Sequence, residues 1–329
     1  MKQCWIISEG AAGMENQALG LAEALGIKPI CVKIPKPPLH NIVPPQMQFS
    51  NHLLKIVKDS AAKETNIKEY PSLVISCGHK AVAYAIALRQ VNPKKTITIH
   101  IQNPMVPSRF FDLIIAPAHD KISGKNIIET NGAIHRITID KLAEAYNHFQ
   151  NDLSTFPKPL ILALVGGSTK RYTFDISAAK EIGKELKTLA LRMNGSVILT
   201  TSRRTDPDCQ HTLKMELENV PGSLWDGNSK NPYLGYLAHA DYILVTCDSI
   251  TMISEAVATG KPVYIFSLKG RGSSRFRKFY DTFLEAGYIK WYNGSLSSWD
   301  YAPPVETELA AKKVKKFLGE RLLDLQQTI

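Results

Sequence analysis

Residues 242–266 read YILVTCDSITMISEAVATGKPVYIF. Two runs rich in apolar, β-branched and aromatic residues, 242–246 and 262–266, have the length of buried strands. Between them lie a polar turn, a helical segment at 254–259 and the chain-turning sequence Gly-Lys-Pro. A strand, a helix and a second strand in this order form the crossover unit of parallel sheets. The segment therefore predicts an α/β fold.

The same alternation runs through most of the chain. Further strands are predicted at 32–34, 73–76, 96–101, 113–116, 160–165 and 195–201, and helices at 16–25, 81–88, 140–153, 174–191 and 306–325. The proline-punctuated sequence STFPKP at 154–159 interrupts the alternation. We therefore predict two Rossmann-like, doubly wound domains at residues 1–154 and 155–305, followed by a terminal helix at 306–329.

Composition places the chain among globular proteins. It has 329 residues, of which 44% are hydrophobic and 21% charged, which excludes disordered and collagen-like chains. Its net charge of +10 favours phosphate-bearing partners, although a basic surface on a soluble protein explains the charge equally well.

The cysteines and the chain start bear on the compartment. The five cysteines form no CxxC pair, which indicates a reducing compartment and no structural zinc. The start, MKQCWIISEG, has too short an apolar run for a signal peptide, and no run of about 18 apolar residues could span a membrane. We expect a cytoplasmic protein, or one that lies on a membrane surface.

Loops that follow strands are the candidate ligand sites, because ligands bind beyond the carboxyl ends of the strands in an open parallel sheet. The first strand leads into SEGAAGMENQ at 8–17. Its small residues and free helix-start amides favour a ligand near the backbone, although a tight turn with solvated polar caps explains them too. The loop lacks the G-x-G-x-x-G dinucleotide pattern. Its candidates are Glu9, Gly10, Gly13, Glu15, Asn16 and Gln17.

Two loops of the second half combine small or hydroxyl residues with cations. The sequence GGSTKRY at 166–172 favours a diphosphate but lacks P-loop spacing. The sequence TTSRRT at 200–205 places an arginine pair at the end of a buried strand, and guanidinium groups bind phosphate oxygens through two parallel hydrogen bonds. The phosphate-binding candidates are Gly166, Gly167, Ser168, Thr169, Lys170, Arg203 and Arg204. The Asp-Pro-Asp at 206–208 is better explained as a turn than as a metal site.

The turn after residue 246 is the most specific of these loops. The Glu255 carboxylate, in the first turns of a helix, can accept hydrogen bonds from both hydroxyls of a ribose. Hydroxyls and amides at Ser249 and Thr251 can face a phosphate. A helix merely capped by Ser249 or Thr251 is the compatible alternative.

Three segments resemble known proteins. The pattern D-S-x-x-M-x-S-E-A-x-x-x-G-K-P, which runs from Asp248 through Ser254 to Pro262, resembles the donor-site segment of GT-B glycosyltransferases, where the glutamate holds the nucleotide ribose. Residues 231–241, with Tyr233, resemble the stretch that precedes it in that superfamily. From Gly10, G-x-x-G-x-x-N-Q-A-L-G-L-A-E-A-L resembles the mitochondrial-fission ELM-type family, whose bacterial members are regarded as glycosyltransferases. The likeness extends to about residue 292. It implies two domains that face a cleft, with the terminal helix returning to the first domain.

The resemblance implies transfer of a sugar from a nucleoside-diphosphate-sugar to a glycolipid or saccharide acceptor, lipid-linked or of the lipopolysaccharide-core type. The second domain would bind the donor without a metal, its cations offsetting the charge of the leaving diphosphate. The first domain would bind the acceptor and, if the reaction inverts, supply a general base, for which Glu9 and Glu15, and after them Asp120, are candidates. Gln102 and Asn103 follow a strand of the first half and are acceptor-side candidates.

Other functions are also compatible with the sequence. A non-catalytic scaffold that recruits a partner is one alternative. A nucleotide-sugar epimerase is another, against which the missing G-x-G-x-x-G and Tyr-x-x-x-Lys patterns argue. Histidine spacing does not suit zinc and basic residues do not alternate with aromatic ones, so we expect no metal, no cofactor and no nucleic acid.

Membrane contact is a further expectation. The basic segment KGRGSSRFRKFY at 269–280 is interpreted equally well as an exposed turn and helix start or as a contact for an anionic acceptor, the donor phosphates or a lipid surface. With the lysine-rich last helix it suggests peripheral contact with the inner face of an anionic membrane, unless those lysines form a solvated helix face.

Overall fold

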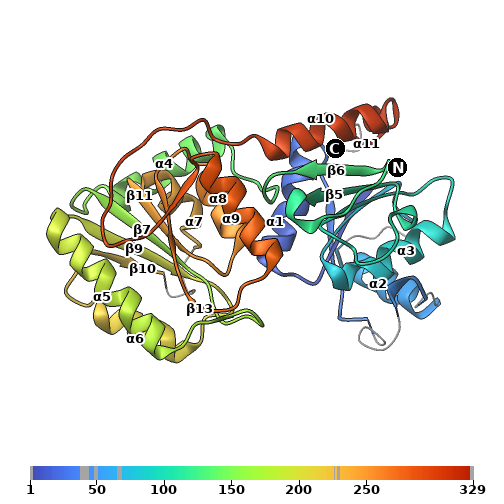
Figure 1. Ribbon diagram of the computed structural model, residues 1–329. Helices are drawn as coiled ribbons and strands as arrows, with labels where there is room; N and C mark the ends of the chain where they lie inside the picture. Colours follow the sequence, from blue (N-terminus) through green and yellow to red (C-terminus); the bar gives the residue numbers. More distant parts are fainter. Residues whose placement is uncertain are drawn as a thin grey trace. The chain divides into compact units, whose positions relative to one another are not determined.

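The computed structural model describes residues 3–37, 44–47, 51–64, 69–225, 227 and 230–326. The chain divides into two compact units (Figure 1). Unit 1 consists of Met1–Arg136 and Val305–Ile329, and unit 2 consists of Ile137–Pro304. Each unit is built on a six-stranded parallel sheet, which confirms the predicted α/β fold with two Rossmann-like parts.

Unit 1 contains the sheet β2-β1-β3-β4-β5-β6 with helices on both faces. Because successive side chains of a strand point to opposite faces, β1 contributes to two cores. Ile6 packs with residues of α1 and α10, whereas Trp5 and Ile7 pack with residues of α2 and α3. The elements are β1 (Cys4–Ser8), α1 (Ala12–Ala24), β2 (Ile30–Lys33), α2 (Asn51–Glu64), β3 (Leu73–Cys77), α3 (Val82–Val91), β4 (Ile97–Ile101), β5 (Leu113–Pro117) and β6 (Ile127–Thr130), with single 3₁₀ turns at Pro45–Met47, His79–Ala81, Ser108–Phe110 and Ala118–Asp120.

The end of the chain returns to unit 1, as expected. Helix α10 (Glu306–Leu318) lies beside β6 (Figure 1). The Asn131 backbone and side-chain amides donate to the Glu306 carboxylate over 3.0 and 2.9 Å, and the His135 amide donates to the Thr307 hydroxyl over 3.0 Å. The predicted single helix is two helices, because Gly319 adopts φ +55° and α11 (Arg321–Gln326) follows it.

Unit 2 contains the parallel sheet β10-β9-β7-β11-β12-β14. The opening segment of the sequence forms its βαβ unit β11-α8-β12, as predicted, but α8 begins at Ile250, because Ser249 caps it. The elements are α4 (Ile139–Leu153), β7 (Leu160–Val165), β8 (Tyr172–Thr173), α5 (Ile176–Met193), β9 (Ser196–Thr201), α6 (Pro207–Glu216), β10 (Gly222–Leu224), α7 (Tyr233–His239), β11 (Tyr242–Thr246), α8 (Ile250–Val257), β12 (Val263–Phe266), β13 (Lys269–Gly270), α9 (Ser274–Glu285) and β14 (Ile289–Trp291).

The units divide between residues 136 and 137, ahead of the predicted boundary at 154/155. Helix α4 accounts for the difference, because it packs against α7. The His239 ring stacks on Tyr146 with centroids 4.1 Å apart, and a Cβ at Gly235 would lie 2.4 Å from the Phe149 ring. STFPKP therefore joins α4 to β7 inside unit 2.

The buried His100 makes unit 1 sensitive to acid. It lies in β4 with its Nδ1 2.8 Å from the Ser76 hydroxyl, and burial, with His79 nearby, lowers its pKa to about 3. Below the ordinary histidine pKa of about 6.5, the unfolded chain binds a proton that the folded chain does not. The free energy of unfolding therefore falls as the pH falls from 6.5 towards 3.

We expect His100→Asn to remove this component of the pH dependence. Between pH 7 and pH 5 the wild type should lose about 2 kcal/mol of stability that the variant retains. Urea unfolding at both pH values measures the difference, with the exposed His211→Asn as control. Equal losses in wild type and His100→Asn would contradict the assignment.

Candidate functional site

Three loops of unit 2 meet because their strands are neighbours. Strands β9, β7 and β11 are adjacent and parallel, so their carboxyl ends lie at one edge of the sheet. The predicted segments at 166–172 and 200–205 and the predicted turn after residue 246 lie there. The sheet order thus brings together residues that are about 80 positions apart in sequence.

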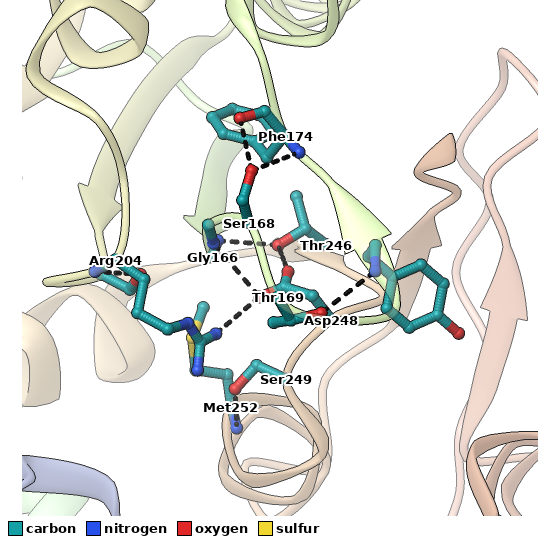
Figure 2. A network of polar contacts seen from close by, with 12 residues as sticks. Gly166, Ser168, Thr169, Phe174, Arg204, Thr246, Asp248, Ser249 and Met252 are labelled. Carbon is teal, nitrogen blue, oxygen red and sulfur yellow. Dashed lines mark hydrogen bonds and ion pairs between the residues drawn. The ribbon is translucent and has the colours of Figure 1, made fainter. Parts of the chain in front are cut away.

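The Asp248 carboxylate joins these loops (Figure 2). Its side chain is fully buried. The Thr246 hydroxyl donates to Oδ1 over 2.7 Å, and the Gly167 amide donates to Oδ2 over 3.1 Å. The Arg204 guanidinium completes the set at 2.6 Å from Oδ2. A buried carboxylate is tolerated when it is paired and hydrogen-bonded, as this one is.

The two glycines are required by close approach. A Cβ at Gly166 would lie 2.1 Å from both carboxylate oxygens of Asp248, and one at Gly167 would lie 2.2 Å from the Arg204 carbonyl oxygen. The Gly166 amide also donates to the Thr246 hydroxyl over 2.7 Å. The two glycines therefore let the loop after β7 pack closely against Asp248 and against the backbone of Arg204.

Arg204 is fixed at one end and open at the other. The Ser202 hydroxyl accepts from the Arg204 amide over 3.1 Å, and the Ser202 amide donates to Val165 O over 2.8 Å. The Arg204 side chain is nevertheless 48% exposed. Since a guanidinium carries five N–H donors and Nη2 meets Asp248, the other donors can meet an anion.

Ser168 and Thr169 shape the glycine loop. The Ser168 hydroxyl donates to Phe174 O over 3.0 Å and accepts from its amide over 2.9 Å. The Thr169 hydroxyl accepts from the Arg171 and Tyr172 amides. Lys170, at the tip, and Arg203, in the neighbouring loop, are exposed.

The start of α8 offers a capped helix terminus. The Ser249 hydroxyl accepts from the Met252 amide over 3.4 Å, which selects Ser249 from the two predicted caps (Figure 2). Thr251 is half-buried in the first turn. Ser254 is buried, and its hydroxyl donates to Ile250 O inside the helix, so it supports α8 itself.

Glu255 pairs with Tyr233. The tyrosine hydroxyl donates to the buried carboxylate over 2.6 Å. Burial, and then the neighbouring carboxylate, raises the pKa of Tyr233 well above its ordinary value, so the phenol stays a donor. At the other end of α7 the Lys261 ammonium donates to Leu237 O over 2.9 Å, and burial lowers its pKa to about 8. Both ends of α7 are thus tied to α8 and the residues that follow it.

The carboxyl edge of unit 1 gathers most of the other candidates. Glu9 forms an ion pair with Lys80 of the loop after β3. The Gln102 Nε2 lies 3.5 Å from the Gln17 Oε1. The Gln102 backbone adopts φ +80°, an uncommon conformation for a residue other than glycine. The Gln17 side-chain amide donates to Gly13 O, and the Asn103 backbone amide donates to Asp120 Oδ2. Gly10 adopts φ +76° in the turn before α1. Glu15 and Asn16 are half-buried in α1.

Sequence reasoning missed three features of these edges. Thr246 bonds both Asp248 and Gly166, and a polar residue at the end of an apolar strand was the available signal. Lys80 pairs with Glu9, and no local pattern indicated it. The short strands β8 and β13 pair with each other, which two-residue strands do not reveal in sequence.

Clustered metal ligands and membrane-spanning helices are two further features that bear on function. Among the described residues, no three His, Cys, Asp or Glu side chains gather as metal ligands would. In that same part of the chain no helix has the length and apolar character to cross a bilayer.

Solved structures define the class of fold. The solved structures that are similar to this chain are GT-B-fold glycosyltransferases and epimerases. The UDP-GlcNAc 2-epimerase of Neisseria meningitidis, solved with UDP-GlcNAc, matches with a TM-score of 0.56 and 14% identity, over 97% of this chain and 99% of that one. At this identity the likeness establishes the fold alone.

Sequence comparison establishes the family. A family model described as "Mitochondrial fission ELM1" matches residues 12–318, and the chain belongs to that family. The mitochondrial fission protein ELM1 of Arabidopsis thaliana is 28% identical over 79% of this chain and 67% of its own length. An uncharacterized protein of Rickettsia prowazekii (strain Madrid E), RP120, is 26% identical over 94% of this chain and 97% of its own.

The packing of Gly166 against Asp248 gives a stability prediction. Gly166→Ala should lower the free energy of unfolding by about 2 to 3 kcal/mol, because its Cβ would overlap the carboxylate. In an Asp248→Ala background the same change should cost at least about 1 kcal/mol less. Urea unfolding of the four proteins measures this coupling. Additive losses would contradict the packing described.

Proposed function

We propose that this protein is a metal-independent glycosyltransferase that uses a nucleoside-diphosphate-sugar. The observation that carries the proposal is the Asp248 network, which holds the half-exposed Arg204 at the carboxyl edge of unit 2. Parallel sheets bind ligands at this edge, and an oriented guanidinium suits a diphosphate.

The donor would lie across the three loops. Arg204 and Arg203 would meet the diphosphate, with Ser249 and the first amides of α8 next to it. Glu255 would accept from the ribose hydroxyls, and Tyr233 would orient its carboxylate. These preorganised donors would stabilise the charge that develops on the leaving diphosphate. The UDP-GlcNAc of the Neisseria structure supports a nucleotide-sugar as the donor class.

Unit 1 would bind the acceptor and supply the base. Among the three predicted bases, Glu9 suits the role best, because its side chain is 21% exposed and Lys80 orients it. Asp120 already accepts from the Asn103 amide and has a buried side chain. Gln17, Gln102 and Asn103 would hold acceptor hydroxyls, since amides both donate and accept hydrogen bonds. The acceptor class we propose is a glycolipid or saccharide.

An epimerase remains the second candidate because of the fold. Epimerases are among the structural neighbours, and an epimerase would need no acceptor. The two reactions give different products, since a transferase releases the nucleotide and an epimerase keeps the sugar attached to it.

Helix α10 supports peripheral contact with an anionic membrane. Leu309 and Phe317 are 51% and 47% exposed, and with Lys313 they share one face, because they are four residues apart. Lys312 and Lys316 are exposed next to them. Exposed apolar side chains among lysines are typical of helices that lie in a membrane interface.

A nucleotide screen tests the donor site. Of UDP, GDP, CMP, ADP and dTDP, one should raise the melting temperature of the wild type, by the equivalent of about 2.7 kcal/mol at 100 times its Kd. Glu255→Ala and Arg204→Ala should lose most of this shift. The exposed Lys180→Ala on α5 should keep it. No shift with any nucleotide, or an equal shift in all proteins, would favour the scaffold.

Vesicle binding tests the membrane contact. Replacing Lys312, Lys313 and Lys316 by Gln should weaken binding to phosphatidylglycerol vesicles roughly a hundredfold, at about 1 kcal/mol per lysine. Phosphatidylcholine vesicles should bind little of either protein. The matched triple change of Lys180, Lys184 and Lys187 on α5 is the control. If both triple variants lose the same vesicle affinity, the net charge of the protein explains the binding and α10 is not the contact.

A further inference from the structure

A two-stranded sheet attaches the basic segment to the glycine loop. Strands β8 and β13 pair antiparallel, with Lys269 opposite Thr173 and Gly270 opposite Tyr172. The start of KGRGSSRFRKFY therefore lies against the end of GGSTKRY, although about 100 residues separate them in the sequence. None of the alternatives that the sequence left open for the basic segment included this pairing.

Packing fixes the two segments on each other. A Cβ at Gly270 would lie 2.1 Å from the Arg171 carbonyl oxygen, so only glycine permits this approach. The Phe276 ring meets the Tyr172 ring at 5.5 Å, and the Arg171 guanidinium lies 5.5 Å from the Phe276 centroid. The Tyr280 hydroxyl donates to Cys247 O, which ties α9 to the Asp248 loop. The basic segment is thus part of the carboxyl edge of unit 2.

The paired segments carry four exposed cations close to one another in sequence or in strand pairing. We call the exposed side chains Lys170, Arg171, Lys269 and Arg271 the basic rim. Residues 166–174 and 267–280 contain no Asp or Glu. Across the part of the chain that the structure describes, no ion pair involves any of the four. Like charges held together repel one another, so the rim favours a bound anion.

The rim exceeds what a diphosphate requires. Arg204 and the start of α8 already supply donors for the proposed diphosphate. Four additional cations would balance about two phosphate monoesters, each of which carries a charge of about −1.5 to −2 at pH 7. A second anionic group next to the donor is the natural occupant.

We propose that the basic rim binds a phosphate group of the acceptor, so that the acceptor is a phosphorylated saccharide. The inference rests on the proposed function and narrows its substrate class. Lys and Arg side chains would bind the phosphate oxygens by charge-assisted hydrogen bonds. The rim would therefore select acceptors that carry phosphate over those that do not.

Titration with glucose 6-phosphate tests the rim, with glucose as the uncharged control. Calorimetry on protein saturated with its nucleotide should show binding of glucose 6-phosphate only. Lys269→Ala/Arg271→Ala should weaken this binding roughly tenfold or more, because the variant can no longer form two of the charge-assisted hydrogen bonds to the phosphate. Lys170→Ala/Arg171→Ala should act alike. The backbone pairing of β8 and β13 uses none of these side chains, and Lys269→Ala/Arg271→Ala also keeps the contact of Arg171 with Phe276, so the fold should survive in that variant.

The control variant and the nucleotide affinity separate the outcomes. Lys180→Ala/Lys184→Ala on α5 removes the same charge and should leave the binding of glucose 6-phosphate unchanged. The Kd of the nucleotide should stay within about twofold of wild type in the rim variants, well below the tenfold that 1.4 kcal/mol represents. A parallel loss of nucleotide affinity would assign the rim to the donor diphosphate and overturn the proposal. Equal binding of glucose 6-phosphate in wild type and rim variants would overturn it as well.

Two further results distinguish this proposal from the proposed function. If no nucleotide binds the wild type, the donor site fails, and the same titration without nucleotide still decides whether the rim binds phosphate. If glucose 6-phosphate does not bind, but phosphatidylglycerol vesicles bind and lose affinity in the rim variants, the rim contacts a lipid surface and the acceptor proposal is wrong.

Discussion

The buried carboxylate of Asp248 is the constraint on which the candidate site depends. A carboxylate removed from water needs several hydrogen bonds, and here they come from three segments of the chain. A strand end supplies the Thr246 hydroxyl, the glycine loop supplies an amide, and the third loop supplies Arg204. The three loops must therefore adopt one mutual arrangement, which the absence of side chains at Gly166 and Gly167 permits.

The same constraint leaves one partner of the Asp248–Arg204 ion pair accessible to a ligand. Asp248 is buried, but its partner Arg204 is half exposed, so the carboxylate fixes a guanidinium that solvent can reach. Unit 1 uses a related arrangement at its own carboxyl edge, where Glu9 after β1 pairs with Lys80 after β3. In that unit the carboxylate is partly exposed and the lysine orients it. The two edges therefore differ in which partner is more open to solvent, the guanidinium in unit 2 and, in unit 1, a lysine beside a partly exposed carboxylate.

Much of the fold was predictable because it follows from periodicity. The βαβ unit at 242–266, the two parallel sheets and the return of the last helix to unit 1 are all confirmed. The position of α4 was not predictable, since a proline-rich connection looks the same within a domain as between domains. The stacking of Tyr146 on His239 and the packing of Phe149 against Gly235 assign α4 to unit 2. At the site, the residues that follow strands could be predicted, but partners such as Lys80 depend on which strands are neighbours.

The two cationic groups of unit 2 differ in how firmly they are held, and this has a consequence for specificity. Arg204 is oriented by a buried carboxylate and a hydrogen-bonded turn, so little conformational entropy is lost when it meets an anion. Lys170 and Lys269 are exposed, and a lysine ammonium is a flexible point charge. A fixed guanidinium favours one geometry, as the constant diphosphate of a nucleotide-sugar requires. Flexible lysines can follow a phosphate whose position varies, so the proposed donor site should be selective where the rim tolerates acceptors of different size.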